Sequence, residues 1–363
     1  MDKKLFKWDK KTVRRGIIVN AAIIVAAGCC IFNYHRTFYR SNVVEVEGEQ
    51  PVLKVYHDFT FDQLCDAAER SGAVADMKLF RRAAERMKLD QELKPGYYRL
   101  KPGMNNKAIV RMIANGWQEP VKVSFTGYIR SLERFSQILS EKFEADSASF
   151  AKVLLDTTVM AKYGFEQESF IGMFIPNTYE FYWTVSPEDF VARMNREYNA
   201  FWSETRKAKA AGIGLTQKEV STLAAIVIEE SKYEPEMPRI AGVYMNRLHK
   251  GILLQADPTV KYALNMKGIT RILNKHLKVD SPYNTYVYKG LPPGPITMPP
   301  IVALDAVLNY EHHNYIYFCA RETFDGQHNF ASTMLQHLEN ARRYHRAYEQ
   351  WDKARKAAAA QSK

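Results

Sequence analysis

The stretch LTQKEVSTLAAIVIEESKYEPEMPRIAGVYMNRLHKGILLQADPTVKY, residues 215–262, decides the fold of the second half of this 363-residue chain. Thr216 and Glu219 have the spacing of a capping box, in which each side chain accepts a hydrogen bond from the backbone of the other. Apolar residues then repeat at helical spacing, at Val220, Leu223, Ala224 and Val227. The pattern predicts a helix that begins after Thr216 and ends before Pro235, because the residue before a proline disfavours helical conformation.

Glu230 lies at the end of this apolar stripe, close to the expected C-terminus of the helix. Its position predicts a half-buried side chain, whereas Glu229 is rotated by about 100° onto the face of Thr222 and is expected to be solvated. Burial and the helix dipole both disfavour a charged carboxylate, so the pKa of Glu230 should be raised, as a general acid near neutral pH requires. The alternative is a purely structural ion pair with Arg239 or Arg247.

Further motifs follow in a fixed order along the chain. They are FIPNTYEF (174–181), IVIEES (226–231), NRL (246–248), LQADPTV (254–260), YNTY (283–286), GLPPGPI (290–296) and HNF (328–330). Over residues 170–335 this series resembles the MltG (YceG-like) family of membrane-anchored endolytic murein transglycosylases, in which a Glu followed by Thr or Ser is catalytic. The resemblance implies that Glu230 is the catalytic residue. Family members commonly carry Glu at the position of Ile228 and Lys at that of Glu229, so Glu229 is the alternative acid.

Polar residues on the surrounding segments are the candidates for substrate binding. These candidates are Asn246, Gln255, Asp257, Tyr283, Asn284, Thr285 and His328. Binding groups usually lie on loops held by a rigid scaffold, although Asp257-Pro258 and the prolines and glycines of 290–296 are also ordinary turn residues. His328 matches the family's histidine before a phenylalanine, and a structural hydrogen bond is its alternative role. No cofactor is expected, and the histidines and cysteines lack the spacing of a metal site.

The N-terminus combines a basic segment, residues 1–15, with the apolar run GIIVNAAIIVAAGCCIFNY, residues 16–34. Nineteen residues at a helical rise cover about 28 Å, close to the hydrocarbon thickness of a bilayer. The positive-inside rule then places the N-terminus in the cytoplasm and the rest of the chain outside the inner membrane. A cleaved signal peptide and a lipoprotein signal ending at Cys29 are the alternatives.

The net charge of +11 is carried mostly by the two ends of the chain, so we expect no nucleic-acid partner. Cys65 and Cys319 lack the spacing of a disulfide framework and are expected to be buried thiols. The expected fold class is α+β, and the resemblance implies LysM-like α+β subdomains and a mainly helical catalytic domain of the lytic-transglycosylase type. The expected segments are 1–15 basic, 16–34 transmembrane, 35–50 linker, 51–118 LysM-like, 119–214 second α+β connector, 215–348 catalytic and 349–363 basic tail.

The resemblance implies cleavage of the MurNAc–GlcNAc bond within peptidoglycan strands, with formation of 1,6-anhydroMurNAc ends. Peptidoglycan strands and the cytoplasmic membrane are then the expected partners, with cell-wall synthases as further candidates. One rival is a muramidase that uses Asp257 as a second carboxylate. The other is a catalytically inert, membrane-anchored scaffold that binds peptidoglycan. For the LysM-like subdomain, a spacer with no affinity for sugars is the alternative.

Overall fold

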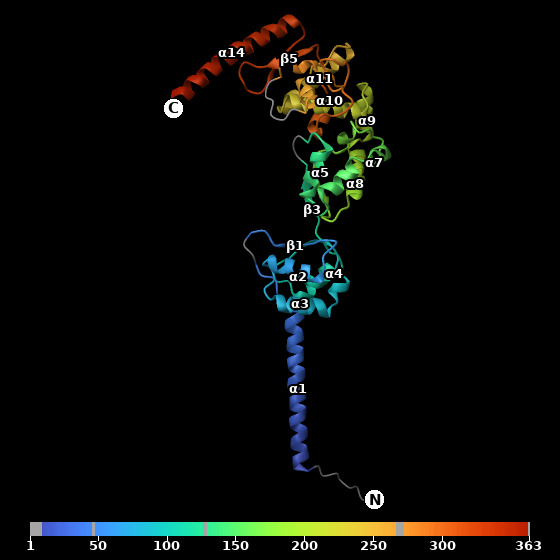
Figure 1. The fold of residues 1–363 in the computed structure, drawn as a ribbon, viewed down its shortest axis with the longest axis vertical. Coiled ribbons are helices and arrows are strands. Elements are labelled where there is room, and N and C mark those ends of the chain that lie inside the picture. Colours follow the sequence, from blue (N-terminus) through green and yellow to red (C-terminus); the bar gives the residue numbers. More distant parts are fainter. Residues whose placement is uncertain (1–8, 46–47, 126–128, 266–271, 362–363) are drawn as a thin grey trace. The chain divides into compact units, whose positions relative to one another are not determined.

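The computed structural model describes residues 9–45, 48–125, 129–265 and 272–361, with side chains described through Lys356 (Figure 1). The chain forms two compact units: unit 1 comprises residues 1–122 and 180–185, and unit 2 comprises residues 123–179 and 186–363. Residues 1–8 of the predicted basic segment, and residues 126–128 of a strand expected to follow Val121, lie outside the described residues.

Unit 1 begins with α1 (Lys10–Phe38), which extends beyond the predicted span 16–34 at both ends. Neither flank contains a proline or glycine that would stop the helix, so the helical structure continues past the apolar run. This helix is long and apolar enough to cross a membrane. Its last turn is buried at Thr37 and Phe38, and the amide of Asn106 donates to the carbonyl oxygen of Thr37 at 2.9 Å.

The sequence of the remainder of unit 1 predicts a strand, two helices, a strand and a helix, and the structure has this order. Its elements are β1 (Val52–Val55), α2 (Phe61–Arg70), α3 (Met77–Arg86), the 3-10 turn η1 (Leu89–Gln91), β2 (Gly96–Arg99) and α4 (Asn106–Ala114). Strands β1 and β2 are antiparallel, with Val52 opposite Arg99. The core contains Leu53, Leu64, Phe80 and Ile109. Asn42 and Val43, in the predicted linker, are also buried here, so this part of the linker belongs to the packed unit.

Unit 2 is mainly helical. Its elements begin with α5 (Leu132–Ser140), α6 (Ser147–Leu154), α7 (Thr157–Lys162), η2 (Phe170–Met173), α8 (Pro187–Phe201), α9 (Glu204–Gly212), α10 (Gln217–Glu230), η3 (Glu234–Glu236) and α11 (Met237–His249). They continue with α12 (Asp257–Ala263), η4 (His276–Lys278), α13 (Ile301–Leu308), β5 (Tyr317–Ala320), β6 (His328–Ala331) and α14 (Met334–Gln361). Strands β3 (Val121–Ser124) and β4 (Thr178–Phe181) pair with each other, and the boundary between the units falls within both strands.

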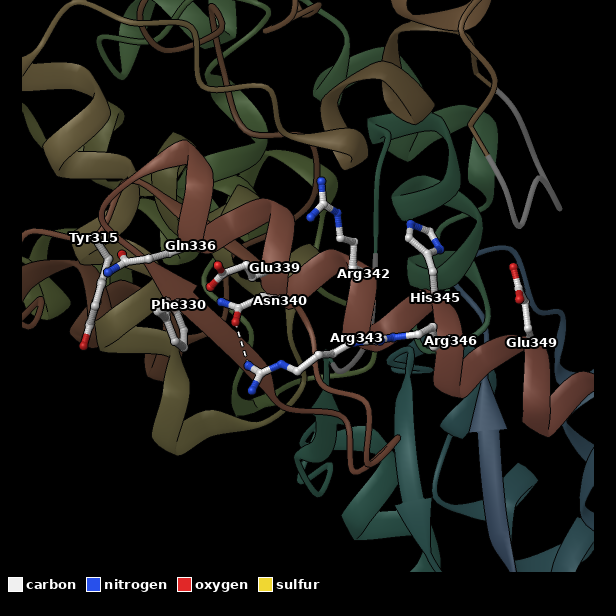
Figure 2. Close-up of a pocket in the computed structure, with 10 residues that line it drawn as sticks. All are labelled: Tyr315, Phe330, Gln336, Glu339, Asn340, Arg342, Arg343, His345, Arg346 and Glu349. Carbon is white, nitrogen blue, oxygen red and sulfur yellow. Dashed lines mark hydrogen bonds between the residues drawn. The ribbon is translucent and has the colours of Figure 1, made fainter.

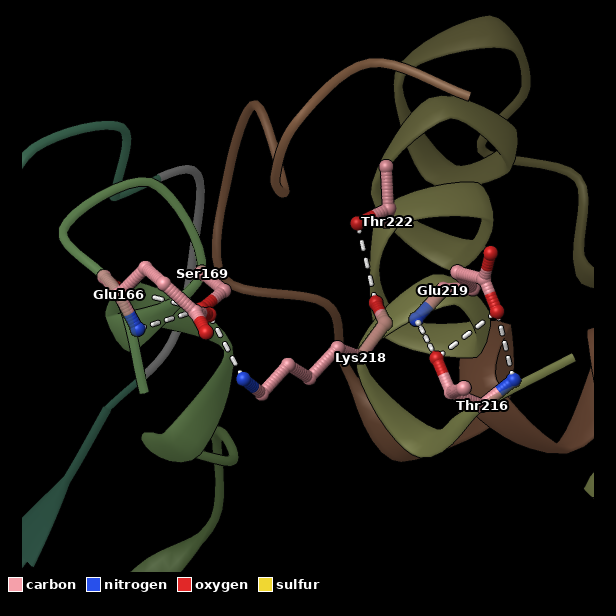
Figure 3. Close-up of polar contacts among 6 residues, drawn as sticks. All are labelled: Glu166, Ser169, Thr216, Lys218, Glu219 and Thr222. Carbon is pink, nitrogen blue, oxygen red and sulfur yellow. Dashed lines mark hydrogen bonds and ion pairs between the residues drawn. The ribbon is translucent and has the colours of Figure 1, made fainter. Parts of the chain in front are cut away.

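Helix α10 begins with the predicted capping box: the backbone N–H of Glu219 donates to Thr216 Oγ1, and that of Thr216 donates to Glu219 Oε2 (Figure 3). Lys218, one position earlier, forms an ion pair of 2.6 Å with Glu166. From residue 220 to residue 227 every side chain of α10 is buried, because α11, α12, α13 and η2 surround the helix. The helix is therefore a central core element, without the solvated face that the sequence predicted on the side of Thr222.

The C-terminal segment differs from the sequence prediction in two respects. The stretch GQHNFAST, residues 326–333, predicts an irregular segment that leads into the last helix. Residues 328–331 of this stretch instead form β6, which is antiparallel to β5. Helix α14 then runs from Met334 to Gln361, whereas a helix ending at Tyr348 and a frayed tail were predicted. Alanine, lysine and arginine dominate this tail, and their high helix propensity explains why the helix continues.

Candidate active site

Glu230 is the last residue of α10, and its side chain is partly buried, as predicted. The hydroxyl of Tyr244, on the neighbouring helix α11, donates a hydrogen bond of 2.8 Å to Glu230 Oε1. Burial raises the pKa of Glu230 from 4.5 to about 7, and the nearby charge of Asp257 adds to the increase, whereas the hydrogen bond from Tyr244 opposes it. Glu230 can therefore hold a proton near neutral pH and can also release it, as general acid–base catalysis requires.

Glu229 is in a different environment from the one that the sequence predicted. Its side chain is only 9% exposed, and both carboxylate oxygens accept hydrogen bonds from Arg130, at 3.1 and 2.6 Å. The prediction of a solvated Glu229 is therefore wrong, because α10 is packed on all sides and the segment before α5 contributes Arg130. The bidentate pair engages both carboxylate oxygens of Glu229. Glu230 has no such partner among the described arginines and is therefore the better candidate for the acid.

The alternative of an ion pair between Glu230 and a neighbouring arginine does not match the structure. Arg239 pairs with Glu311 at 2.9 Å. Arg247 is buried and donates to backbone carbonyl oxygens, including that of Ile316 at 2.7 Å, and to Gln255 Oε1 at 3.1 Å. Both arginines thus hold the fold around the site.

Two pockets share Glu230 as a lining residue. One, of about 420 Å³, also contains Tyr244, Arg247, Gln255, Asp257 and Tyr286, together with residues of β5 and the first turns of α14. The other, of about 630 Å³, contains Ser231, Tyr233 and His328, together with the turn between β5 and β6 and Tyr344. Glu230 therefore borders both pockets.

Gln255 and Asp257 are the predicted binding residues that line the first pocket with Glu230. Asp257 begins helix α12, so the segment is more regular than predicted, and its Oδ1 accepts a hydrogen bond of 2.7 Å from the hydroxyl of Tyr286. Gln255 has a positive φ of 52°, a conformation that is strained for a residue with a side chain. Both side chains are exposed, so they can reach a ligand in this pocket.

Four other predicted residues are held by contacts inside the fold. Asn284 is fully buried, and its amide donates to the carbonyl oxygens of Leu277 and Val279, at 3.0 and 2.8 Å. Thr285 Oγ1 accepts from the backbone N–H of Ala256 at 2.9 Å and so positions the segment of Gln255 and Asp257. The ring of Tyr283 packs against Tyr262, and Asn246 donates to the carbonyl oxygens of His313 and Tyr315.

His328 lines the second pocket and is bound twice by a buried carboxylate. Its backbone N–H donates to Glu236 Oε1 at 3.1 Å, and its Nδ1 lies 2.8 Å from Glu236 Oε2. The side chain of Glu236 is 4% exposed, so this contact fixes the imidazole ring firmly. His328 thus makes a structural hydrogen bond, its alternative role, and it also lines the pocket, so its role in substrate binding stays a prediction.

Sequence reasoning missed Tyr244, Tyr286, Arg130 and Glu236 as parts of the site. Tyr244 follows the apolar stripe of its own helix, so its spacing is that of an ordinary core residue, and only the contact with α10 reveals its hydroxyl. Arg130 lies 99 positions before its partner in the chain, beyond the reach of any local pattern. Gly294 had been interpreted as a turn residue, but a Cβ atom there would lie 1.9 Å from the carbonyl oxygen of Glu168, so close backbone packing requires glycine.

Comparisons with known proteins agree with one another. The sequence profile of the YceG-like family matches residues 53–343. An endolytic murein transglycosylase of Bacillus subtilis is 30% identical over 275 residues, which cover 69% of this chain and 72% of that protein. A protein of the same name from Streptococcus pneumoniae is 29% identical, and the match spans half of its length. The crystal structure of a yceG-like protein from Listeria monocytogenes superposes with a TM-score of 0.55 and 25% identity, over 80% of this chain and 98% of that one.

Proposed function

The chain belongs to the YceG-like family, and from this premise we propose that it is an endolytic murein transglycosylase in which Glu230 is the single acid–base group. Its relatives are named murein transglycosylases, which are lyases that act on peptidoglycan. The observation that supports the role of Glu230 is its pKa of about 7, raised by burial, in a residue that borders two pockets.

The reaction needs one proton to be given and then taken back. Protonated Glu230 donates to the glycosidic oxygen as the bond between that oxygen and C1 of MurNAc breaks. The resulting carboxylate accepts the proton of the C6 hydroxyl, whose oxygen bonds to C1 and closes the 1,6-anhydro ring. Protons and bonds balance without water, and Glu230 regains its starting state.

The positive charge that develops on the sugar ring needs nearby negative or polar groups. Asp257 and Gln255 line one pocket with Glu230, and we assign them this role together with the positioning of the sugar. The hydrogen bond from Tyr286 holds the Asp257 carboxylate in place. His328, fixed by Glu236, is assigned to substrate contact in the second pocket.

Cleavage within a strand requires sugars to be bound on both sides of the broken bond. The position of Glu230 at the border of two pockets supports this endolytic mode. Asp257 in the same pocket as Glu230 is the observation that favours the second candidate, a hydrolase with two carboxylates. Digestion of purified peptidoglycan by the full chain tests the choice, because the transglycosylase yields anhydro ends that are lighter by one water than those of the hydrolase.

We also propose that α1 anchors the protein in the cytoplasmic membrane with unit 2 on its outer side. The support is the length and apolar character of this helix and the seven basic residues among the first fifteen of the chain. The test is a reporter enzyme that works only outside the cytoplasm. Fused after Lys363, it should be active. A mature N-terminus found at a lipid-modified Cys29 would contradict the anchor.

The two-stranded antiparallel sheet of unit 1, with two helices between its strands, supports a LysM-like subdomain. We propose that it holds glycan close to the membrane and that synthases of the cell wall supply the strands. The test is a binding assay between unit 1 and purified glycan strands. If no binding is detected, unit 1 is only a spacer.

A further inference from the structure

Four aromatic rings form a continuous cluster that borders the pocket of Glu230 and lies along helix α14. They are Phe324, in the turn between β5 and β6, and Tyr344, Tyr348 and Trp351 on the helix. The ring of Phe324 lies 5.9 Å from those of both Tyr344 and Trp351. Tyr348 lies 6.2 Å from Tyr344 and 5.8 Å from Trp351. We call these four residues the aromatic platform.

The aromatic platform is open to solvent. Phe324, Tyr348 and Trp351 are 45%, 43% and 47% exposed. Large aromatic side chains that gather on a surface leave apolar area in contact with water, and such patches commonly mark binding surfaces. The aromatic platform therefore needs an explanation beyond the packing of α14 on the rest of unit 2.

The backbone of Phe324 gives an independent indication. Its φ is 55°, in the left-handed region, which bulky side chains rarely adopt. Conformations of this kind cost free energy and concentrate at binding and catalytic sites. Here this conformation accompanies a Phe324 ring that lies beside Tyr344 in a residue that remains 45% exposed.

The platform is continuous with the proposed active site. Phe324 and Tyr344 line the pocket that contains Glu230, Tyr233 and His328. Tyr348 and Trp351 lie about one and two turns further along α14, and the ring of Trp351 returns to within 5.9 Å of Phe324. Arg342, Arg343, His345 and Glu349 of the same helix surround a separate pocket, as Figure 2 shows.

We propose that the aromatic platform is an extended sugar-binding site that holds the glycan strand beyond the pocket of Glu230. This inference rests on the proposed function, and it states which surface the glycan strand contacts after it leaves the pocket of Glu230. Pyranose rings have a flat apolar face of C–H groups and a polar rim of hydroxyls. Exposed aromatic rings pack against that face, while the hydroxyl groups of the sugar and of Tyr348 stay in water.

The test is a binding measurement with the full chain in detergent, in the Glu230→Gln background so that strands are not cut. The double variant Tyr348→Ala/Trp351→Ala should bind long glycan strands, stripped of stem peptides, about tenfold more weakly, a change of about 1.4 kcal/mol. Binding of a single disaccharide, the repeat unit of the strand, should weaken by about twofold at most. Both side chains are exposed, so the variant should fold, and its circular dichroism should match that of the parent.

The matched control is Leu335→Ala on the same helix. Leu335 is 67% exposed and lies about 180° around the helix from Tyr344, so its removal deletes apolar surface outside the platform. Strand binding should then stay unchanged. If the double variant binds long strands as tightly as its parent, the proposal is wrong. The proposal is also wrong if the aromatic platform contacts lipid or a second copy of the chain instead. Quenching of Trp351 fluorescence in brominated nanodiscs would show contact with lipid, and sedimentation would show contact with a second copy. Strand binding is measured here without cleavage. Failure of this proposal can therefore be distinguished from failure of the proposed function, which is tested by the products of cleavage.

Discussion

The hydroxyl of Tyr244 donates a hydrogen bond of 2.8 Å to Oε1 of Glu230. The bond joins the end of α10 to the middle of α11, within a core in which Tyr244 is 2% exposed. It stabilises the charged form of the carboxyl group and opposes the effect of burial, which is the larger of the two. The balance of these two effects places the pKa of Glu230 at about 7, where one group can act in turn as acid and as base.

Replacing Tyr244 with Phe should move the pH dependence of cleavage to higher pH. The change removes a hydrogen bond to the carboxylate, so the pKa of Glu230 should rise further. Because Glu230 must be protonated to begin the reaction, kcat/KM of the parent should fall above pH of about 7, and that fall should begin later in the variant. The measurement is kcat/KM on soluble strands as a function of pH.

Asp257→Asn should shift the pH dependence of kcat/KM in the opposite direction in the same assay. The charge of Asp257 raises the pKa of Glu230, so its removal should move the fall of kcat/KM to lower pH, whatever happens to the maximal rate. Shifts in the same direction for both variants, or no shift in either, would mean that Glu230 does not control the alkaline limb.

Glu230→Gln should change how stability depends on pH. The pKa of Glu230 is higher in the folded protein, about 7, than its ordinary value of 4.5, so the folded state binds the proton more tightly. This contribution to stability is present below pH 4.5 and is lost as the pH rises through 7. The variant does not lose this contribution. Between pH 5 and pH 8, the free energy of unfolding of the variant should therefore increase by on the order of 3 kcal/mol relative to that of the parent. Urea unfolding at both pH values measures it, and equal changes in both proteins would contradict the raised pKa.

Asn284→Ala should act mainly through the fold. The substitution leaves the carbonyl oxygens of Leu277 and Val279 without their buried donor, which should lower the free energy of unfolding by about 2–3 kcal/mol. Activity per folded molecule should change little. Gln255→Ala is the matched control: its exposed side chain lines the pocket, so turnover should fall without a comparable loss of stability. A stable Asn284→Ala protein with lost turnover would return Asn284 to the role of a substrate ligand.

Local patterns predicted much of the secondary structure. The capping box at Thr216, the end of α10 before Pro235 and the strand and helix order of unit 1 are all present, because short-range spacing determines them. The burial and raised pKa of Glu230 also follow from its place on the apolar stripe. The environment of Glu229 could not be predicted in this way, since it depends on Arg130, and the same holds for Tyr244 and Glu236, which reach the site through tertiary contacts.

The central claim is that Glu230 alone carries the proton in strand cleavage. The most direct measurement is mass analysis of the ends produced when the full chain, its Glu230→Gln variant and its Glu229→Gln variant digest purified peptidoglycan. The account predicts 1,6-anhydro ends from the parent and from Glu229→Gln, and none from a folded Glu230→Gln protein that still binds strands. Anhydro ends from the Glu230→Gln variant, or their loss only in Glu229→Gln, would contradict it.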